Sequence, residues 1–422
     1  MTHVESPGWN WAGNLRYRAA RLHRPETLDE LRAIVAHSRK LHALGSRHSF
    51  NDVADCEADL VSLDRMPHAP VIDRERRTAT VGAGITYAQL CPQLHRAGFA
   101  LHNLASLPHI SVAGAIATAT HGSGDGNGNL ATAVSEITLV TAEGEVVTLS
   151  RERDGERFAG AVVALGGLGV VVRVTLDLLP AFEVRQQVYR RLLMAQLEAH
   201  FDAIMNSAYS VSLFTDWQSD FVDQVWLKQR VGDRAPDADG DFFGAAPATQ
   251  PQHPIASLSA EPCTTQMGIA GTWHERLPHF RPDHVPSVGD ELQSEYFVPR
   301  RFAVEAMRAV AALRRHFTPV LLISEVRSIA ADALWLSPCY AQACIGLHFT
   351  WKKDWLAVQR VLPLIEAALG PFEPRPHWGK LFALSPAQLR VRYPRLADFR
   401  ALAHDLDPQG KFRNAFVERL LN

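Results

Sequence analysis

Apolar positions in the N-terminal half follow helix and strand spacings in turn. Residues 25–40 carry an apolar side chain every three or four positions, which predicts an amphipathic helix. Thr27 followed by Glu30 predicts a capping box at its start. The apolar run 41–44 predicts a short strand before the sequence "GSRHSFND". Residues 77–98 predict a strand, a glycine turn and a second helix that starts with a capping box of Thr86 and Gln89.

The rest of this half predicts strands. Residues 135–150 predict a hairpin around Glu143 and Gly144, and residues 165–180 predict a glycine turn followed by a β-branched strand. Short strands that alternate with helices over 180 residues predict an α+β domain.

After Pro180 the pattern changes. Residues 231–265 are rich in Pro, Ala, Asp and Gly, which predicts an exposed loop. Beyond residue 286, strand-like runs at 320–326 and 345–351 alternate with amphipathic helical patterns at 302–315 and 354–369. This part predicts a second α+β domain, so the 422 residues form two domains.

Composition excludes several classes of protein. A net charge of −2 argues against a nucleic-acid partner or a polybasic membrane anchor. The 5 cysteines are scattered and contain no C-x-x-C pair, which favours reduced thiols in a cytoplasmic protein. Neither a secretory signal nor an apolar run of bilayer length is recognised, so we expect no membrane partner.

The common motifs for binding dinucleotides, phosphates and catalytic zinc are incomplete in this sequence. The glycines at 82–84 lack the third glycine of a dinucleotide fingerprint, and the Gly-Lys pairs at 379–380 and 410–411 lack the Ser or Thr of a phosphate-binding loop. The pattern H-E-x-x-x-H at 274–279 is one residue too long for a zinc protease and contains a proline. We therefore predict no metal site.

Glycine and hydroxyl residues gather instead in several loops of the N-terminal half. The loops are 45–46, 82–84, 111–114, 118–128 and 166–169. Any one of them is explained by turn formation alone. Together they indicate backbone N–H groups converging on an anionic ligand such as a pyrophosphate.

Two strands of the second half carry polar pairs. Glu325 and Arg327 share one face of a strand, as do His348 and Thr350 on another. An exposed ion pair is the ordinary explanation for Glu325 and Arg327 alone. Both pairs lie within apolar runs, however, which favours the polar floor of a cavity.

Three runs of sequence resemble the vanillyl-alcohol-oxidase type of FAD-dependent oxidases: "GSRHSFND", "NLASLPHISVAGAIATATHGSG" and "DPQGKFRNAF". The second half is similar to the alditol (xylitol/sorbitol) oxidase branch in runs such as "YSVSLFTDWQ", "WHERLPHF", "HFTW" and "RPHWGK". The resemblance implies a two-domain α+β flavoprotein with a bipartite FAD-binding α+β domain and a substrate-binding α+β cap domain. Residues 1–180 and 371–422 form the FAD-binding domain, and residues 181–370 form the cap.

The resemblance also implies the cofactor and its ligands. His48 bonds covalently to the 8α-methyl group of FAD. Some relatives have glycine in place of Arg47, which leaves two roles open for this residue, pairing with a phosphate or shielding the loop. The other implied cofactor-binding residues are Gly45, Ser46, Ser49, Ser106, Ser111, Gly114, Thr118, Thr120, His121, Gly169, Val171, His377 and Asn414.

Substrate chemistry is assigned by the same resemblance. Lys380 matches the active-site lysine of alditol oxidases and meets the reacting hydroxyl with His348, and either one can take the proton. Arg327 holds the oxygen and supports the anionic charge of the reduced flavin or the developing alkoxide. Glu325 belongs to the same catalytic and substrate-binding set, while Ser106 and Thr350 bind further hydroxyls.

The expected activity is oxidation of the C1 alcohol of xylitol or sorbitol to the aldose, with reduction of O2 to H2O2. We expect a monomer whose partners are the polyol and O2. The alternatives are an aldonolactone or other sugar oxidase or dehydrogenase of the same superfamily, a metal-dependent hydrolase that uses some of the 19 histidines, and a non-catalytic flavin- or carbohydrate-binding protein.

Overall fold

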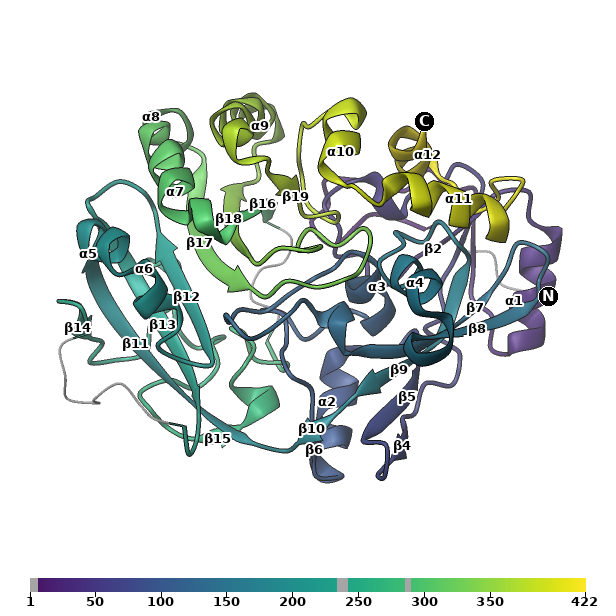
Figure 1. Ribbon diagram of the computed structural model, residues 1–422, viewed down its shortest axis with the longest axis horizontal. Coiled ribbons are helices and arrows are strands. Elements are labelled where there is room, and N and C mark those ends of the chain that lie inside the picture. Colours follow the sequence, from purple (N-terminus) through teal and green to yellow (C-terminus); the bar gives the residue numbers. More distant parts are fainter. Residues whose placement is uncertain (1–6, 234–241, 285–289) are drawn as a thin grey trace.

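Two separate groups of strands organise the chain. The computed structural model describes residues 7–233, 242–284 and 290–422. The N-terminal half lies on one side of the molecule, and the middle of the chain builds a large sheet on the other side (Figure 1). Among the described residues, none of the helices combines the length and the apolar character needed to cross a bilayer.

The N-terminal half contains an antiparallel five-stranded sheet. Its strands, in spatial order, are β4 (Val71–Asp73), β5 (Thr78–Gly82), β9 (Val170–Asp177), β7 (Val134–Val140) and β8 (Val146–Ser150). The predicted hairpin is confirmed, because β7 and β8 pair around a turn in which Gly144 has φ 79°. The strand predicted after the glycine turn at 166–169 is β9.

A small parallel sheet carries the loop of interest. It consists of β1 (Arg21–His23), β3 (Asp59–Val61) and β2 (Leu41–Ala43), and a further pair joins β6 (Phe99–Ala100) to β10 (Leu179–Pro180). The helices of this half are α1 (Leu28–His37), α2 (Tyr87–Arg96), α3 (Val112–Ala117) and α4 (Arg151–Val162).

The two predicted capping boxes have different outcomes. At α2 the box is complete, since Thr86 and Gln89 exchange side-chain and backbone hydrogen bonds. At α1 the Thr27 hydroxyl accepts from the Glu30 N–H at 3.2 Å, but the Glu30 carboxylate accepts from the N–H of Glu26 instead of Thr27. The reciprocal bond predicted for α1 is therefore wrong.

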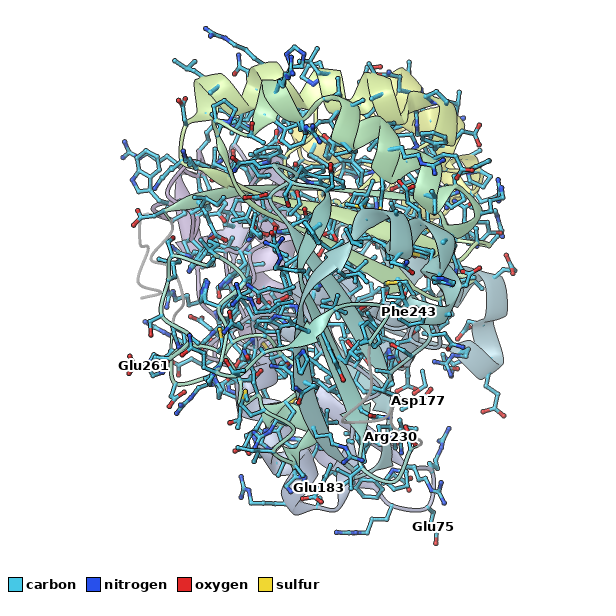
Figure 2. The ribbon with its side chains drawn as sticks, turned by 90° about the vertical axis from the view of Figure 1, so that its left-hand side faces the viewer. Glu75, Asp177, Glu183, Arg230, Phe243 and Glu261 are labelled. Carbon is cyan, nitrogen blue, oxygen red and sulfur yellow. The ribbon has the colours of Figure 1, made fainter. Side chains whose placement is uncertain are left out.

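Within the described residues, the large sheet has nine strands. Eight of them run in the order β14 (Ala246–Pro247), β11 (Glu183–Leu193), β13 (Phe221–Arg230), β12 (Ser210–Thr215), β17 (Leu321–Ile329), β18 (Cys344–Lys352), β16 (Glu291–Pro299) and β19 (Arg375–Pro376), and β15 (Gly271–Thr272) pairs with β11. Figure 2 shows this part of the molecule with its side chains, with Glu183 and Arg230 at the same end of β11 and β13.

Helices cover one face of the large sheet. They are α5 (Met194–Ala199), α6 (Phe201–Met205), α7 (Ala303–Ala312), α8 (Arg314–Phe317) and α9 (Trp355–Leu369). Phe349 and Trp351 of β18 pack in one core with Val310 and Val358 of these helices. The alternating residues of β18 consequently face the opposite side of the sheet. The helix predicted at 302–315 is present but divided between α7 and α8.

The exposed loop predicted at 231–265 is confirmed in part. Residues 234–241 lie outside the described part of the chain. Apart from the two-residue strand β14, which pairs with β11, the described remainder lacks helices and strands, and many of its residues are exposed. Phe242, Ala248 and Cys263 are buried instead, because these side chains pack against the large sheet.

The C-terminal segment returns to the N-terminal half. Its helices α10 (Pro386–Arg392), α11 (Leu396–Leu406) and α12 (Ala415–Leu421) lie beside the N-terminal elements (Figure 1). Phe399 and Val417 share one hydrophobic core with Ile116 and Ala161. The fold is therefore a two-domain α+β architecture with one bipartite domain, as predicted, while the boundaries at residues 180 and 370 stay a prediction.

Candidate active site

One cavity of about 690 Å³ joins the glycine loops to the large sheet. This volume is within the range of sites that hold cofactors and substrates. All but one of the predicted site residues line it: Gly45, Ser46, Arg47, His48, Ser49, Ser106, Ser111, Gly114, Thr118, Thr120, His121, Gly169, Val171, Glu325, Arg327, His348, Thr350, His377 and Lys380.

The exception is Asn414. Its side-chain carbonyl accepts from the N–H of Val417 and caps α12, and its amide donates to the carbonyls of Val53 and Asp55 at 2.8 Å. Asn414 is buried and is not among the residues that line the cavity. The structure therefore gives Asn414 a role in joining the C-terminal segment to the N-terminal half.

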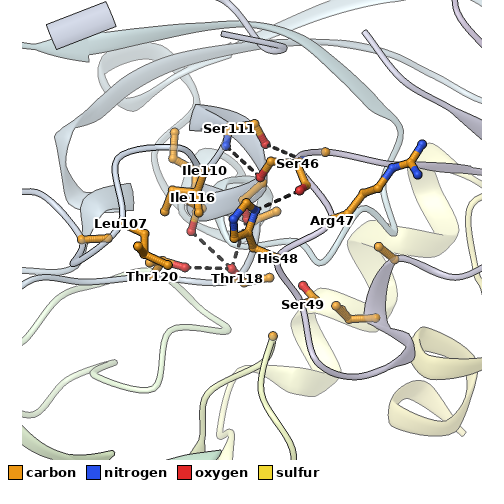
Figure 3. Close-up of a pocket in the computed structure, with 18 of the residues that line it drawn as sticks. Ser46, Arg47, His48, Ser49, Leu107, Ile110, Ser111, Ile116, Thr118 and Thr120 are labelled. Atoms are coloured by element: carbon orange, nitrogen blue, oxygen red, sulfur yellow. Dashed lines mark hydrogen bonds between the residues drawn. The ribbon is translucent and has the colours of Figure 1, made fainter. Parts of the chain in front are cut away.

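The loop after β2 is locked onto the start of α3. The Ser46 hydroxyl accepts from the N–H of Ser111 at 3.0 Å, and the Ser111 hydroxyl accepts from the N–H of Ser46 at 3.3 Å (Figure 3). A Cβ atom at Gly45 would lie only 2.6 Å from the Ser111 hydroxyl, so glycine is required there for close approach. This arrangement holds backbone groups of two loops against the same wall of the cavity.

His48 projects from this loop as a half-buried, neutral imidazole. Its Nδ1 lies 2.8 Å from the Ser46 carbonyl, and its ring stacks on Trp11 at a centroid distance of 5.3 Å. Burial lowers the pKa of His48 to about 4. At neutral pH one ring nitrogen therefore keeps a lone pair, which a covalent bond to an electrophilic carbon requires.

Arg47 connects the loop to the N-terminal segment. Its φ is 64°, a left-handed conformation that favours glycine. Its guanidinium donates to the Pro7 carbonyl at 2.6 Å, and its own carbonyl accepts from the N–H of Trp11. Figure 3 shows the side chain pointing away from Ser46, Ser111 and His48. The contacts of Arg47 thus secure the segment that packs Trp11 against His48.

The polar floor on the large sheet forms as the strand alternation predicts. Strands β17 and β18 are antiparallel neighbours, and Glu325 lies directly opposite His348. The Arg327 guanidinium donates to both oxygens of the Glu325 carboxylate at 2.5 Å. Glu325 and Arg327 are 5% and 7% exposed and line the cavity, so the alternative of an exposed surface ion pair is wrong.

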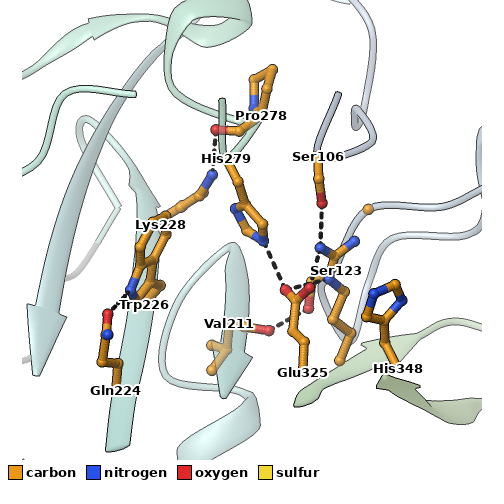
Figure 4. A network of polar contacts seen from close by, with 12 residues as sticks. Ser106, Ser123, Val211, Gln224, Trp226, Lys228, Pro278, His279, Glu325 and His348 are labelled. Carbon is orange, nitrogen blue, oxygen red and sulfur yellow. Dashed lines mark hydrogen bonds and ion pairs between the residues drawn. The ribbon is translucent and has the colours of Figure 1, made fainter. Parts of the chain in front are cut away.

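Hydrogen bonds extend this floor in two directions. The Arg327 guanidinium also donates to the hydroxyl of Ser106, a residue of the N-terminal half, and His279 lies 2.7 Å from Glu325 on the other side (Figure 4). Burial lowers the pKa of His279 to about 3 against the opposing effect of Glu325. His279 is therefore neutral and donates its Nε2 proton to the carboxylate.

Lys380 meets the floor from the C-terminal segment. Its Nζ lies 2.6 Å from the Glu295 carboxylate and 2.6 Å from Nδ1 of His348. Burial lowers the pKa of His348 to about 4, and the charge of Lys380 adds to this effect. Because Nδ1 of this neutral ring accepts from Lys380, its Nε2 carries the proton and donates to the Thr350 hydroxyl at 3.1 Å.

The carboxylates stay ionised and Lys380 is destabilised as a cation. Burial opposes the charge of Glu295 and of Glu325, but their cationic neighbours outweigh it and the pKa of each carboxyl is well below its usual value. Burial lowers the pKa of Lys380 while Glu295 opposes that change. A lysine whose pKa is lowered gives up its proton more readily than an exposed lysine does.

Three contributors were missed by the sequence reasoning: Trp11, His279 and Glu295. Glu295 could have been found by the same rule as Glu325, because it alternates with apolar residues on the strand "ELQSEYFVP". His279 and Trp11 lie outside any periodic pattern, so only the folded chain brings them to the cavity.

The cavity fits a long ligand with an anionic part. The loops pack so closely that added Cβ atoms at Gly45 and Gly114 would strike Ser111, which leaves backbone and hydroxyl groups to face the ligand. The opposite end holds carboxylates, a lysine and neutral histidines that can accept or donate a proton. Within the described ranges, the side chains of His, Cys, Asp and Glu form no group of three or more that could hold a metal ion.

Comparisons with known proteins agree in sequence and in fold. A family model described as an FAD binding domain matches residues 19–150, and a second, described as D-arabinono-1,4-lactone oxidase, matches residues 290–420. Alditol oxidase from a Streptomyces species (strain IKD472 / FERM P-14339) is 51% identical over 417 residues, which cover 98% of each chain.

More distant relatives extend the comparison. L-gulono-1,4-lactone dehydrogenase from Mycobacterium tuberculosis is 28% identical over 437 residues, which cover 99% of both chains. The crystal structure of cholesterol oxidase from B. sterolicum superposes with a TM-score of 0.80 at 15% identity and covers 100% of this chain and 98% of that one. At that identity the superposition supports the fold alone.

Proposed function

The chain belongs to the vanillyl-alcohol-oxidase type of FAD-dependent oxidases, and from this premise we propose that it oxidises the C1 alcohol of an acyclic polyol such as xylitol or sorbitol to the aldose, with O2 reduced to H2O2. The observation that carries the proposal is the cluster formed by the buried Arg327 and Glu325 with the half-buried Lys380 and His348 at one end of the cavity. A polyol presents hydroxyls on every carbon, and a dense set of paired donors and acceptors can bind several of them at once.

The cofactor would occupy the other end of the cavity. The loops around Ser46, Ser111 and Thr118 would hold it, and His48 would form the covalent bond to its 8α-methyl carbon. When bound, FAD supplies the acceptor for the hydride that leaves the carbinol carbon. The neutral state of His48 and its fixed ring plane against Trp11 support the covalent assignment.

Lys380 is the group to which we assign the hydroxyl proton. Nδ1 of His348 already accepts from Lys380, and Nε2 is engaged with Thr350, so this ring is less available than the amine. Arg327 orients the same oxygen and stabilises negative charge on it as the C–H bond breaks. Glu325 fixes Arg327 in a bidentate pair and offers a carboxylate to a neighbouring hydroxyl.

Oxidation of an aldonolactone is the second candidate. The match of residues 290–420 to the D-arabinono-1,4-lactone oxidase model and the full-length similarity to a gulonolactone dehydrogenase favour it. The two candidates differ in the shape of the substrate, because a lactone ring cannot present an extended row of hydroxyls to Glu325 and Thr350. We place the open-chain polyol first for that reason.

A peroxide assay tests the proposal. Purified protein is incubated in air with xylitol, sorbitol, glycerol and gulonolactone, and H2O2 is measured with a coupled peroxidase. Faster turnover of xylitol or sorbitol than of gulonolactone is expected. Faster turnover of the lactone would overturn the substrate assignment, and anaerobic xylitol that leaves the flavin colour unbleached would show a binding protein instead of an oxidase.

A further inference from the structure

Glu295 is a buried carboxylate in the centre of this site that the polyol chemistry above does not use. It is 1% exposed. One oxygen lies 2.6 Å from Nζ of Lys380 and 3.6 Å from Nδ1 of His348, and the other lies 3.0 Å from Nε2 of His121. An ionised carboxylate at this depth is stable only with such partners, so its position is tied to theirs.

Strand register dictates where Glu295 stands. In the antiparallel sheet Glu295 of β16 is opposite His348 of β18, which is opposite Glu325 of β17. Directly opposite residues project from the same face, so the three side chains form one row along the cavity floor. Glu295 is thereby fixed by the sheet on the side of His348 away from Glu325.

The backbone of β16 also holds the segment that carries Lys380. The carbonyl of Glu295 accepts from the N–H of His377 at 3.0 Å, and the carbonyl of Gln293 accepts from the N–H of Leu381 at 2.9 Å. Lys380 lies between these two anchor points. A single strand therefore sets the position of Lys380 through its backbone and the position of the amine through Glu295.

No other neighbour named below stabilises the Lys380 cation in the way that Glu295 does. Arg327 opposes the lysine cation, and His348 is neutral. His377 faces the same groups, and burial lowers its pKa well below the usual value, so it brings no positive charge. Glu325 is already paired with Arg327 through both oxygens.

His121 gives Glu295 a second hydrogen-bond partner. Its Nδ1 lies 2.7 Å from the Gly122 carbonyl and its Nε2 lies 3.0 Å from the Glu295 carboxylate. Both ring nitrogens are therefore engaged, and the ring is fixed between the backbone and the carboxylate. Glu295 thus lies between Lys380 and His121.

We propose that Glu295 is a positioning residue for the alcohol oxidation: it anchors Lys380 beside His348 and lets the amine hold the proton that the substrate hydroxyl releases. The inference rests on the proposed function for its catalytic meaning, but the control of Lys380 by Glu295 is a property of the resting protein. Without the carboxylate, burial and Arg327 leave the amine neutral to lower pH, and it becomes a weaker base.

The proton state of Lys380 can be measured directly because the chain has only six lysines, Lys40, Lys228, Lys352, Lys353, Lys380 and Lys411. In FAD-loaded protein labelled with 13C at lysine Cε, NMR signals are followed as a function of pH, and Lys380→Arg identifies the relevant signal by its loss. In Glu295→Gln the Lys380 midpoint is expected to fall by about one pH unit or more, because an opposite charge at contact distance shifts a pKa by about 1 to 3 units.

Two controls separate this effect from a loss of structure. Lys228 is buried, donates to the carbonyls of Leu277 and Pro278, and does not contact Glu295, so its signal should stay unchanged. Glu366→Gln removes another buried carboxylate, which accepts from the hydroxyl of Tyr296, and should leave the Lys380 midpoint unchanged.

The outcomes are distinct. An unchanged Lys380 midpoint in Glu295→Gln, with the Lys228 signal in place, overturns the proposal. If Glu295→Gln does not fold, Glu295→Asp decides. This variant keeps the negative charge, so its Lys380 midpoint should fall by less than the one pH unit expected on loss of the charge. In kinetics, the acidic limb of kcat/KM for xylitol should move to lower pH in Glu295→Gln. Failure of the unsubstituted protein to oxidise polyols would reject the proposed function. The titration would still test whether Glu295 controls the protonation of Lys380.

Discussion

At the scale of single residues, Lys380 is unusual because its amine is largely removed from water, whereas most lysines are solvated. It is held by the buried Glu295 and the half-buried His348, and desolvation of the amine lowers its pKa. We expect Lys380→Met to reduce kcat/KM for xylitol by about 10²- to 10⁴-fold, the usual contribution of a general base. The exposed Lys353 provides the control, and Lys353→Met should keep the rate of the unsubstituted protein. Equal rates in the two variants would remove Lys380 from the chemistry.

His48 has a separate role that a different measurement isolates. His48→Ala deletes the nucleophilic nitrogen but leaves the Ser46–Ser111 contacts that shape the loop. Flavin should therefore be released into the supernatant when this variant is precipitated with acid, while the yellow colour of the unsubstituted protein stays in the pellet. Colour released from both proteins contradicts the covalent assignment without affecting the assignment of Lys380.

At the scale of elements, the register of three strands builds the polar floor. Gly346 of β18 lies opposite Arg327 of β17 and Phe297 of β16. A Cβ atom there would come within 2.9 Å of the Glu295 carboxylate, whose oxygens are fixed by Lys380 and His121. Space at this position is therefore part of the active-site geometry.

Gly346→Ala tests that geometry. The added methyl group must displace the Glu295 carboxylate by a few tenths of an ångström, so we expect kcat for xylitol to fall by about tenfold, a modest effect for misplaced catalytic groups. Thermal unfolding should change by only a few degrees, because the strand has no left-handed backbone at Gly346. Gly126→Ala is a control, since a Cβ atom at Gly126 would meet nothing within 4 Å. A rate equal to that of the control would contradict the argument.

The sequence predicts elements better than it predicts their neighbours. Alternation along 320–326 and 345–351 was enough to place Glu325 with Arg327 and His348 with Thr350 on common faces. The pairing of β16 with β18 joins residues about 50 positions apart, and no local pattern specifies which strands meet or in what register. The sequence therefore showed on which face of its strand Glu295 lies, but not which residues it contacts. The Pro- and Ala-rich composition of 242–265 predicts an exposed loop, but it does not reveal that Phe242, Ala248 and Cys263 pack against the sheet.

At the scale of the whole molecule, the cavity lies where the two domains meet. Ser106 of the N-terminal half reaches Arg327 of the large sheet, and Lys380 arrives from the C-terminal segment. The site therefore exists only in the assembled chain, and its buried ionisable groups couple the chemistry to the stability of the fold.

This coupling predicts how stability depends on pH. The folded-state pKa values of His279 and His348 are about 3 and about 4, whereas in the unfolded chain both return to about 6.5. Between about pH 6.5 and 5 the unfolded chain binds more protons than the folded chain, so the free energy of unfolding falls as pH falls. Each fully unmatched proton costs about 1.4 kcal/mol per pH unit, and the pair therefore costs up to about 3 kcal/mol per pH unit near pH 5.

Urea unfolding at several pH values from 5 to 7.5 measures this slope. Above pH 7 both histidines are neutral in both states and their contribution vanishes; Glu295 and Glu325 enter only below about pH 5, where the unfolded chain begins to protonate its carboxylates. His279→Gln keeps an N–H donor for Glu325 and removes one of the two protons, so the slope should fall by about 1.4 kcal/mol per pH unit. His404→Gln, at an exposed position of α11, should keep the original slope. An identical slope in both variants would show that His279 is protonated alike in the folded and unfolded chain, and its neutral donation to Glu325 would then be wrong.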